Sequence, residues 1–401
     1  METLRATCPL PTKGSTMSRR LPDFALEVYL GQHEFTVRHH LTASDAQSCS
    51  LDELLAMGDE SDRRAFGELS LGYTPTSGTA PLRSAIAATY ENLTEADVLV
   101  CSGAQEAMFW AMQILVEPGD HAIVSVPNYQ SMESVAIATG ADVSGLALWT
   151  GHGSSLQWTL DLERVKALLR PNTKLIAVNF PNNPTGFVPD LATWLELVEL
   201  CDRRGIWLYS DEVYRGLELD TTKRLPQAGD LSPRAISLNV MSKAYGLPGL
   251  RIGWLGCQDR SLLSRLERAK HYTTICNAGP SEFLATLALR NAEAVTARNR
   301  RIMHDNLPAL QAMMKRCEGI VEWSVPDGGC VMFPRYLGAN GVEAFAESLV
   351  RERSAVVLPA SVYASQLLEI PRDRFRLGMG RANPEEGWAQ LEAHLLDAQS
   401  R

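Results

Sequence analysis

The chain has 401 residues, 45% of them hydrophobic and 21% charged, which is the composition of a globular protein long enough for two domains. Its formal net charge of −9, without a marked stripe of Lys and Arg, argues against nucleic acid as a partner. No apolar stretch approaches the roughly 18 residues of a membrane span, and the eight cysteines form no CxxC pair, which argues against a disulfide framework or a zinc site. We therefore expect a cytoplasmic protein with no metal and no membrane partner.

Residues 1–20 contain prolines, a glycine and basic side chains, but they lack the apolar region of a secretory signal. We expect them to form a disordered leader, with Met17 as an alternative first residue. Residues 21–60 carry no long strand-like run, and we expect this segment to join a smaller domain.

From about Leu82 to Thr274, short apolar runs alternate with helical patterns. This alternation predicts βαβ units, and hence an α/β fold with a mostly parallel sheet of seven strands between helices. We assign residues 61–285 to this large domain. Its expected strands are Val98–Cys101, His121–Val126, Asp142–Leu148, Lys174–Phe180, Ile206–Tyr209, Ile236–Val240 and Ile252–Gly256. Its expected helices include Gln105–Val116, Leu162–Leu169 and Ala192–Arg203.

The pattern changes after Pro280, and we assign residues 286–401 to a smaller α+β domain. A long helix is expected from Ser281 to about Cys317, and Gly328–Gly329 mark a turn. The remaining expected elements are strands at Val321–Ser324, Cys330–Arg335, Ala355–Leu358 and Arg374–Met379, a helix at Val342–Arg353 and a final helix from Pro384.

Three polar clusters directly follow apolar or β-branched runs of the large domain. They are NNPTG at Asn182–Gly186, SDEVY at Ser210–Tyr214 and SKAYGLPGLR at Ser242–Arg251. Open α/β sheets place their ligands at the carboxyl ends of the strands, so we expect the three clusters to converge on one site.

The residue types in these clusters suit pyridoxal phosphate (PLP), whose aldehyde needs a lysine amine. Lys243 is the candidate for that amine. Asp211 ends an apolar strand, where an unpaired carboxylate is costly, and a protonated ring nitrogen would supply its cationic partner. Arg251 precedes another buried strand and needs an anion such as phosphate.

Other residues support this hypothesis, although each also has an ordinary structural explanation. Ser102, Gly103 and Ala104 open a helix, whose free N–H groups suit a phosphate, but Ser-Gly is also common at helix starts. Tyr129 could stack on a flat ring or be a core tyrosine. Tyr214 and Asn183 could both donate to the phenolic oxygen of the cofactor.

In its motifs from about Leu71 to Arg381, the chain resembles the class I/II aminotransferases of the aspartate aminotransferase superfamily, which have PLP fold type I. The resemblance rests on NNPTG, SDEVY, SKAYGLPGLR and RFRLGMG, together with LGYTPTSGTAPLR near residue 73. It implies a Schiff base on Lys243, and phosphate binding by Arg251 with Ser102, Gly103 and Ala104.

The same resemblance assigns further roles. Tyr129 would stack on the ring, Asn183 and Tyr214 would contact the phenolic oxygen, and Asp211 would hold the ring proton. Arg376 would bind the substrate α-carboxylate.

The resemblance also implies a homodimer with composite active sites. Tyr73 would reach the phosphate of the neighbouring subunit, and Lys270, His271 or Tyr272 would tune substrate choice across the interface. A helix end packed in the dimer contact explains the segment Lys270–Thr274 equally well.

Two departures from the family pattern bear on the reaction. Val240 stands where many relatives have a serine, and Ser242 is a candidate replacement for that phosphate contact. The usual N-terminal substrate loop is not recognisable around Leu41–Ser50.

We expect transamination between an L-amino acid and a 2-oxo acid. The alternative is β/γ-elimination, replacement or cyclisation, supported by a fainter similarity of GAQEAMF and KHYTTICNAGPSE to capreomycidine-synthase-like proteins of guanidino-amino-acid metabolism. A catalytically silent PLP-binding regulator is a third hypothesis. It is disfavoured because only about 20 residues precede the fold.

Overall fold

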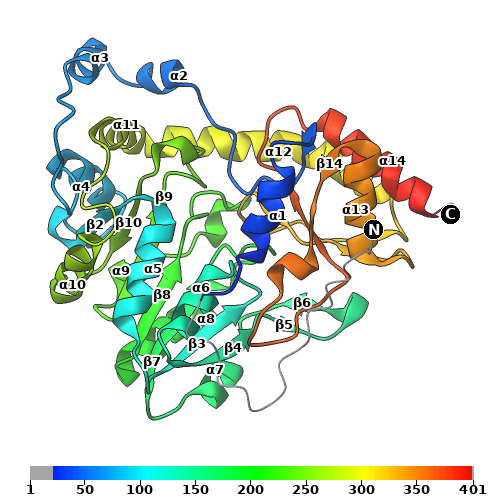
Figure 1. Ribbon diagram of the computed structural model, residues 1–401, viewed down its shortest axis with the longest axis horizontal. Coiled ribbons are helices and arrows are strands. Elements are labelled where there is room, and N and C mark those ends of the chain that lie inside the picture. Colours follow the sequence, from blue (N-terminus) through cyan, green and yellow to red (C-terminus); the bar gives the residue numbers. More distant parts are fainter. Residues whose placement is uncertain (1–20, 400–401) are drawn as a thin grey trace, which may run out of the picture.

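The computed structural model describes residues 21–399, and a seven-stranded sheet forms its centre (Figure 1). The predicted leader lies outside the described residues. The strand order is β2-β10-β9-β8-β7-β3-β4; β10 is antiparallel to both neighbours and the other pairs are parallel. The strands are β2 (Val98–Cys101), β3 (His121–Val126), β4 (Asp142–Ala147), β7 (Thr173–Asn179), β8 (Trp207–Asp211), β9 (Ala235–Val240) and β10 (Gly253–Gly256).

Alternate strand residues point to opposite sides of the sheet, and both sets are apolar, so helices cover both faces. On one face Ala122, Val124 and Leu175 pack with α5 (Gly103–Leu115), α6 (Ser131–Ala138) and α10 (Arg260–Lys270). On the other face Ile123, Ile176 and Leu208 pack with α7 (Leu162–Leu168), α8 (Leu191–Arg204) and α9 (Ala228–Leu231). The predicted α/β class and the seven strands are confirmed.

The helix expected from Ser281 to Cys317 is two helices, α11 (Gly279–Arg290) and α12 (Ala292–Arg316). Asn291 separates them, and its side-chain amide donates to the carbonyls of Leu287 (2.9 Å) and Met57 (3.4 Å). A residue that bonds the backbone locally competes with the helix ladder, which explains the break.

The C-terminal region contains short strands that pack against α12 and two further helices. A three-stranded sheet has the order β12-β16-β15, β11 pairs with β13, and Phe345, Phe375 and Leu391 share one buried cluster. The expected strand Ala355–Leu358 is interrupted at Val357. The elements are β11 (Val321–Glu322), β12 (Val331–Met332), β13 (Arg335–Tyr336), α13 (Gly341–Arg353), β14 (Ala355–Val356), β15 (Leu358–Pro359), β16 (Phe375–Gly378) and α14 (Glu385–Gln399).

The segment 21–60 lies against two different parts of the fold. Its strand β1 (His39–His40) pairs in parallel with β14, whereas Leu54 of α2 packs with Leu82 and Leu284 beneath α11. The chain in between therefore crosses the edge of the central sheet where the polar clusters lie. The elements before β2 are α1 (Ala25–His33), α2 (Leu51–Leu55), α3 (Glu60–Gly67) and α4 (Ala80–Ala87).

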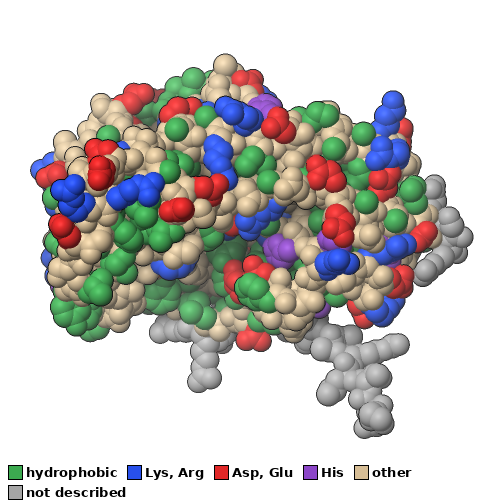
Figure 2. All heavy atoms as spheres, turned by 90° about the horizontal axis from the view of Figure 1, so that it is seen from above, with side chains coloured by type: hydrophobic (Ala, Val, Ile, Leu, Met, Phe, Trp, Pro, Cys, Tyr) green, Lys and Arg blue, Asp and Glu red, His purple; other side chains and the backbone are tan. Residues whose placement is uncertain are grey.

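The hairpin of β5 (Trp149–Thr150) and β6 (Gln157–Trp158) projects beyond β4, beside the C-terminal region (Figure 1). Within residues 21–399, no helix is long and apolar enough to cross a bilayer. The face in Figure 2 carries acidic and basic side chains intermixed rather than in separate fields.

Candidate active site

Lys243 lies just beyond the end of β9, at the edge of the sheet where the three polar clusters meet. Its Nζ donates to the hydroxyl of Ser44, at 2.8 Å, and the side chain is half-buried. Burial lowers the pKa of this amine, and the nearby Arg376 guanidinium lowers it further, while Asp45 opposes the shift. The site therefore favours the neutral, nucleophilic amine more than water does.

Asp211 ends β8 and is only 5% exposed. Its carboxylate accepts the backbone N–H of Val213, at 3.2 Å. Burial raises the pKa of Asp211 to about 7, although the Val213 N–H and the charge of Lys243 oppose this. A buried carboxylate of this kind gains from a cationic partner, and a ring N–H⁺ would provide it.

Two further predicted residues line the same site. The Tyr214 hydroxyl is buried and makes no direct hydrogen bond of acceptable geometry within the described residues. Burial raises the pKa of Tyr214, so this hydroxyl remains protonated and able to donate. The side-chain oxygen of Asn183 accepts from Arg376 (3.2 Å) and Tyr363 (3.1 Å), which directs the Asn183 amide nitrogen away from both.

The start of α5 forms a concave site against Arg251. Gly103 has φ +81°, and a Cβ at this position would lie 2.6 Å from Nη2 of Arg251. Only glycine therefore allows the guanidinium to approach the first turn of the helix, between Ser102 and Ala104. Ser242 lies 3.5 Å from Nη1 of Arg251, which brings its hydroxyl to the same site despite Val240.

Arg376, on β16, is 2% exposed. It donates to the Tyr363 hydroxyl (2.7 Å), to Asn183, and to the hydroxyl (3.1 Å) and carbonyl (2.7 Å) of Thr42. All of these acceptors in the described chain are neutral. A buried guanidinium with neutral acceptors is well suited to a carboxylate ligand.

Tyr129 does not stand free above the site. Its hydroxyl donates to Glu27 of α1, at 2.5 Å, and its ring lies 4.7 Å from that of Phe24. Burial and the neighbouring carboxylate both raise the pKa of Tyr129. The helix α1 thus contacts the residue expected to stack on the cofactor ring.

Two of the residues expected to act across a subunit interface, Tyr73 and Lys270, lie in different environments. Tyr73 is 92% exposed, so its side chain is free to contact another molecule. Lys270 is 1% exposed and donates within its own chain to the carbonyls of Thr76 (2.7 Å) and Val100 (2.8 Å) and to Asn277 (3.2 Å). This places the ammonium of Lys270 in the fold rather than at a surface.

Sequence reasoning missed four residues around the site: Glu27, Thr42, Ser44 and Tyr363. Thr42 and Ser44 belong to the segment in which no family loop was recognised, yet they contact Arg376 and Lys243 directly. Short polar residues in an irregular segment give no periodic pattern, and their positions depend on the pairing of β1 with β14 far along the chain.

The chain belongs to the family "Aminotransferase class I and II", whose model matches residues 46–387. Capreomycidine synthase of Streptomyces vinaceus is 30% identical over 379 residues, which cover 94% of each chain. The arginine–pyruvate transaminase AruH of Pseudomonas aeruginosa is 30% identical over 312 residues, covering 73% of this chain and 74% of the relative.

Solved structures agree with this assignment. A PLP-dependent aminotransferase from Streptococcus suis superposes with a TM-score of 0.86 at 28% identity, covering 94% of this chain and 98% of the other. The PLP-dependent cyclase OrfR superposes with a TM-score of 0.84 at 25% identity, covering 96% and 100%. The protein has PLP fold type I, as its motifs predicted, and it is a PLP-dependent enzyme of this family.

The residues present fit this cofactor. Tyr214 offers a buried hydroxyl that lies near Ser44 but makes no hydrogen bond of acceptable geometry in the described chain. The start of α5 offers a site that a Cβ would fill, and Asp211 is a buried carboxylate whose pKa is lowered by the charge of Lys243 and raised by burial. PLP, when bound, supplies an aldehyde for amines and a ring that withdraws electrons from them. Lys243 would hold its aldehyde, Asp211 its ring nitrogen, and Arg251 with Ser102–Ala104 its phosphate.

Proposed function

We propose that the protein transfers the amino group of an L-amino acid to a 2-oxo acid, using PLP held by Lys243. The observation that carries this proposal is the buried Arg376, whose neutral partners leave its charge available for the α-carboxylate common to both substrates. Asn183 accepts from Arg376 and is also expected to contact the phenolic oxygen of the cofactor. The substrate α-carboxylate and the cofactor would therefore be oriented by the same group of hydrogen-bonded side chains.

The environment of Lys243 suits proton transfer at the substrate Cα. The lowered pKa of its amine makes the neutral base more available near neutral pH. Ser44 fixes the direction of Nζ through the 2.8 Å hydrogen bond. Asp211 would keep the ring nitrogen protonated, so that electrons released from Cα are stabilised.

The test is a panel of L-amino acids paired with 2-oxo acids, with both products measured. We expect one new amino acid to form for each 2-oxo acid released. Arg376→Lys should raise KM for the amino acid by at least about tenfold, since lysine cannot form a bidentate pair. Substrates that yield no new amino acid with any acceptor would contradict transamination.

A second candidate is cyclisation, elimination or replacement on a guanidino amino acid. It is supported by the 94% coverage of capreomycidine synthase in both directions and by the likeness to the cyclase OrfR. These reactions use the same cofactor contacts as transamination. They differ in products, because the substrate loses or rearranges its side chain and no amino acceptor is consumed.

Glu27 favours a substrate with a cationic side chain under either reaction. Its carboxylate is exposed at the site, bonds Tyr129 through Oε1 and acts electrostatically on Lys243 and Tyr363. A negative charge here attracts a distal guanidinium and repels a distal carboxylate. The transaminase among the relatives is named for arginine, which carries that group.

The charge of Glu27 can be tested with arginine and citrulline, which have similar shapes but differ in charge. We expect the protein to use arginine in preference to citrulline. Glu27→Gln should reduce that preference by about tenfold, a difference of about 1.4 kcal/mol. Equal use of arginine and citrulline by the unaltered protein would contradict a guanidino substrate. It would leave transamination of other amino acids intact.

A further inference from the structure

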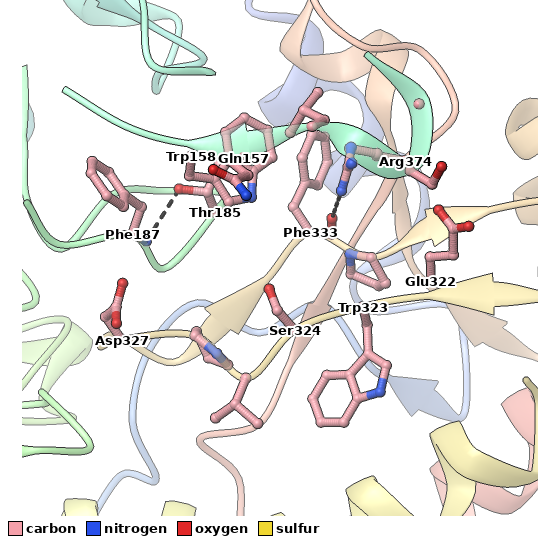
Figure 3. A pocket seen from close by; sticks show the side chains of 16 residues that line it. Gln157, Trp158, Thr185, Phe187, Glu322, Trp323, Ser324, Asp327, Phe333 and Arg374 are labelled. Atoms are coloured by element: carbon pink, nitrogen blue, oxygen red, sulfur yellow. Dashed lines mark hydrogen bonds between the residues drawn. The ribbon is translucent and has the colours of Figure 1, made fainter. Parts of the chain in front are cut away.

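A second cavity of about 430 Å³ lies outside the cofactor site, between the β5–β6 hairpin and the C-terminal region (Figure 3). Its walls come from the hairpin, from the loop that follows NNPTG and from the chain around β11 and β12. The volume is within the range of small-molecule sites. None of the cofactor-binding residues assigned above lines it.

Three charged residues line this cavity: Arg374, Glu322 and Asp327. Glu322 pairs with Arg335 and Asp327 with Lys223, which leaves Arg374 as the lining charge without an ion pair in the described chain.

Arg374 is 8% exposed, Nη1 donates to the carbonyl of Phe333 at 2.9 Å, and Nε is buried without a hydrogen-bond partner in the described chain. Its guanidinium lies 5.2 Å from the centre of the Trp158 ring. No carboxylate within residues 21–399 forms an ion pair with it, unlike the neighbouring Arg335, which pairs with Glu322 and Asp373.

A buried guanidinium without a directly paired carboxylate is costly, because its charge is desolvated and the nearby Asp373 and Glu322 compensate it only in part. Trp158 compensates some of this cost through the ring face. A ligand carboxylate would compensate more, since charge-assisted hydrogen bonds to arginine are strong and directional.

The rest of the lining matches a flat apolar group beside that carboxylate. Aromatic and polar side chains both contribute to the walls (Figure 3). The aromatic residues are Trp158, Phe187, Trp323 and Phe333. Flat rings stack favourably on such walls, with roughly 0.5–1.5 kcal/mol per aromatic pair beyond burial.

We propose that this cavity binds a small aromatic carboxylate, with its carboxylate on Arg374 and its ring against Trp158. The cavity is connected to the active site, because Phe333 packs against Tyr363 at 5.6 Å and Tyr363 accepts from Arg376 at 2.7 Å. Arg374 and Arg376 also belong to one extended segment, two residues apart. Occupancy is therefore expected to alter the KM for the amino acid rather than cofactor binding.

The probe is phenylacetate, compared with the neutral phenylacetamide, titrated into the PLP-loaded protein and followed by calorimetry and tryptophan fluorescence. Phenylacetate could also occupy Arg376, so the titration is repeated in Arg376→Lys. We expect binding to persist in Arg376→Lys and to weaken at least tenfold in Arg374→Gln. The amide should bind at least tenfold more weakly than the acid.

Arg335→Gln is the matched control, because it removes a nearby arginine that is already paired with carboxylates. Trp158→Leu tests the same site without altering a charge, should Arg374→Gln fail to fold. Equal binding of acid and amide, loss of binding only in Arg376→Lys, or no binding of phenylacetate at any soluble concentration would each overturn the proposal.

Discussion

Lys243 is held by Ser44, a residue contributed from 199 positions earlier in the chain. This contact keeps the amine at the carboxyl end of the central sheet, where its charge acts on the carboxylate of Asp211 and lowers the pKa of that group. Lys270, the other lysine considered for the active site, does not share this environment, since it is buried and donates to backbone carbonyls.

Replacing Lys243 with alanine should abolish covalent attachment of PLP while leaving the fold intact, because the residue is only half-buried. The unaltered protein should show visible absorption, and borohydride should fix the cofactor on the peptide that contains Lys243. Lys243→Ala should lose both properties and lower turnover by about three orders of magnitude or more. Trapping on a different lysine would contradict the assignment.

Asp211→Asn should change the pH dependence of stability of the cofactor-free protein. The pKa of Asp211 is raised to about 7, against about 3.9 in an unfolded chain. The carboxyl group therefore contributes most favourably below pH 4, and this contribution is lost as the pH rises towards 7.

The amide of the Asp211→Asn variant cannot ionise, so the variant should gain stability relative to the unaltered protein as the pH rises, by about 3 kcal/mol between pH 5 and pH 8. Glu212, whose pKa burial also raises to about 7, is present in both proteins and largely cancels in the comparison. Thermal unfolding at pH 5 and pH 8 measures the difference. A constant difference between the two pH values would show that Asp211 is not the titrating group.

At the scale of elements, the junction of β2 with α5 determines phosphate binding. Gly103→Ala would place a Cβ 2.6 Å from Nη2 of Arg251 and would strain a φ of +81°. We expect PLP to dissociate at least tenfold more readily from this variant.

Gly119→Ala is the control, because its φ is +97° and no atom lies within 4 Å of the added Cβ. It should lose stability through backbone strain without a comparable loss of PLP affinity. Equal PLP affinity in Gly103→Ala and the unaltered protein, measured by equilibrium titration, would count against the phosphate site.

The elements themselves were largely predictable from sequence, and the contacts between distant elements were not. All seven sheet strands follow from apolar runs such as Val98–Cys101 and His121–Val126, which the structure reproduces with the same bounds. The contacts of Glu27 and Thr42 join residues more than 100 positions apart. Such pairs carry no local periodicity, so only the assembled fold reveals them.

At the scale of the whole molecule, one surface carries large apolar side chains that are exposed to solvent. Tyr73 is 92% exposed, Leu71 84% and Tyr272 87%. The segments that carry them lie together, since Thr74 donates to the carbonyl of Asn277 at 2.9 Å. Exposed apolar groups of this size suit a protein interface, and a two-fold pair of identical chains is the commonest one.

We predict that each active site of this pair takes Tyr73 from the other subunit. Tyr73→Ala and Lys243→Ala chains should each be inactive alone. Co-refolding or co-expressing them should restore about one quarter of full activity, because half of the randomly formed dimers are hybrids with one intact site of two. Mixing Lys243→Ala with Arg376→Ala is the informative control.

Arg376 acts in the same chain as Lys243, so a hybrid of Lys243→Ala and Arg376→Ala chains has no intact site. One of its sites lacks Arg376, and the other lacks Lys243. That mixture should stay inactive. Sedimentation should show a dimer at assay concentration. An active monomer, or a Tyr73→Ala chain with full activity and unchanged PLP affinity, would contradict a composite site and assign Tyr73 to the interface alone.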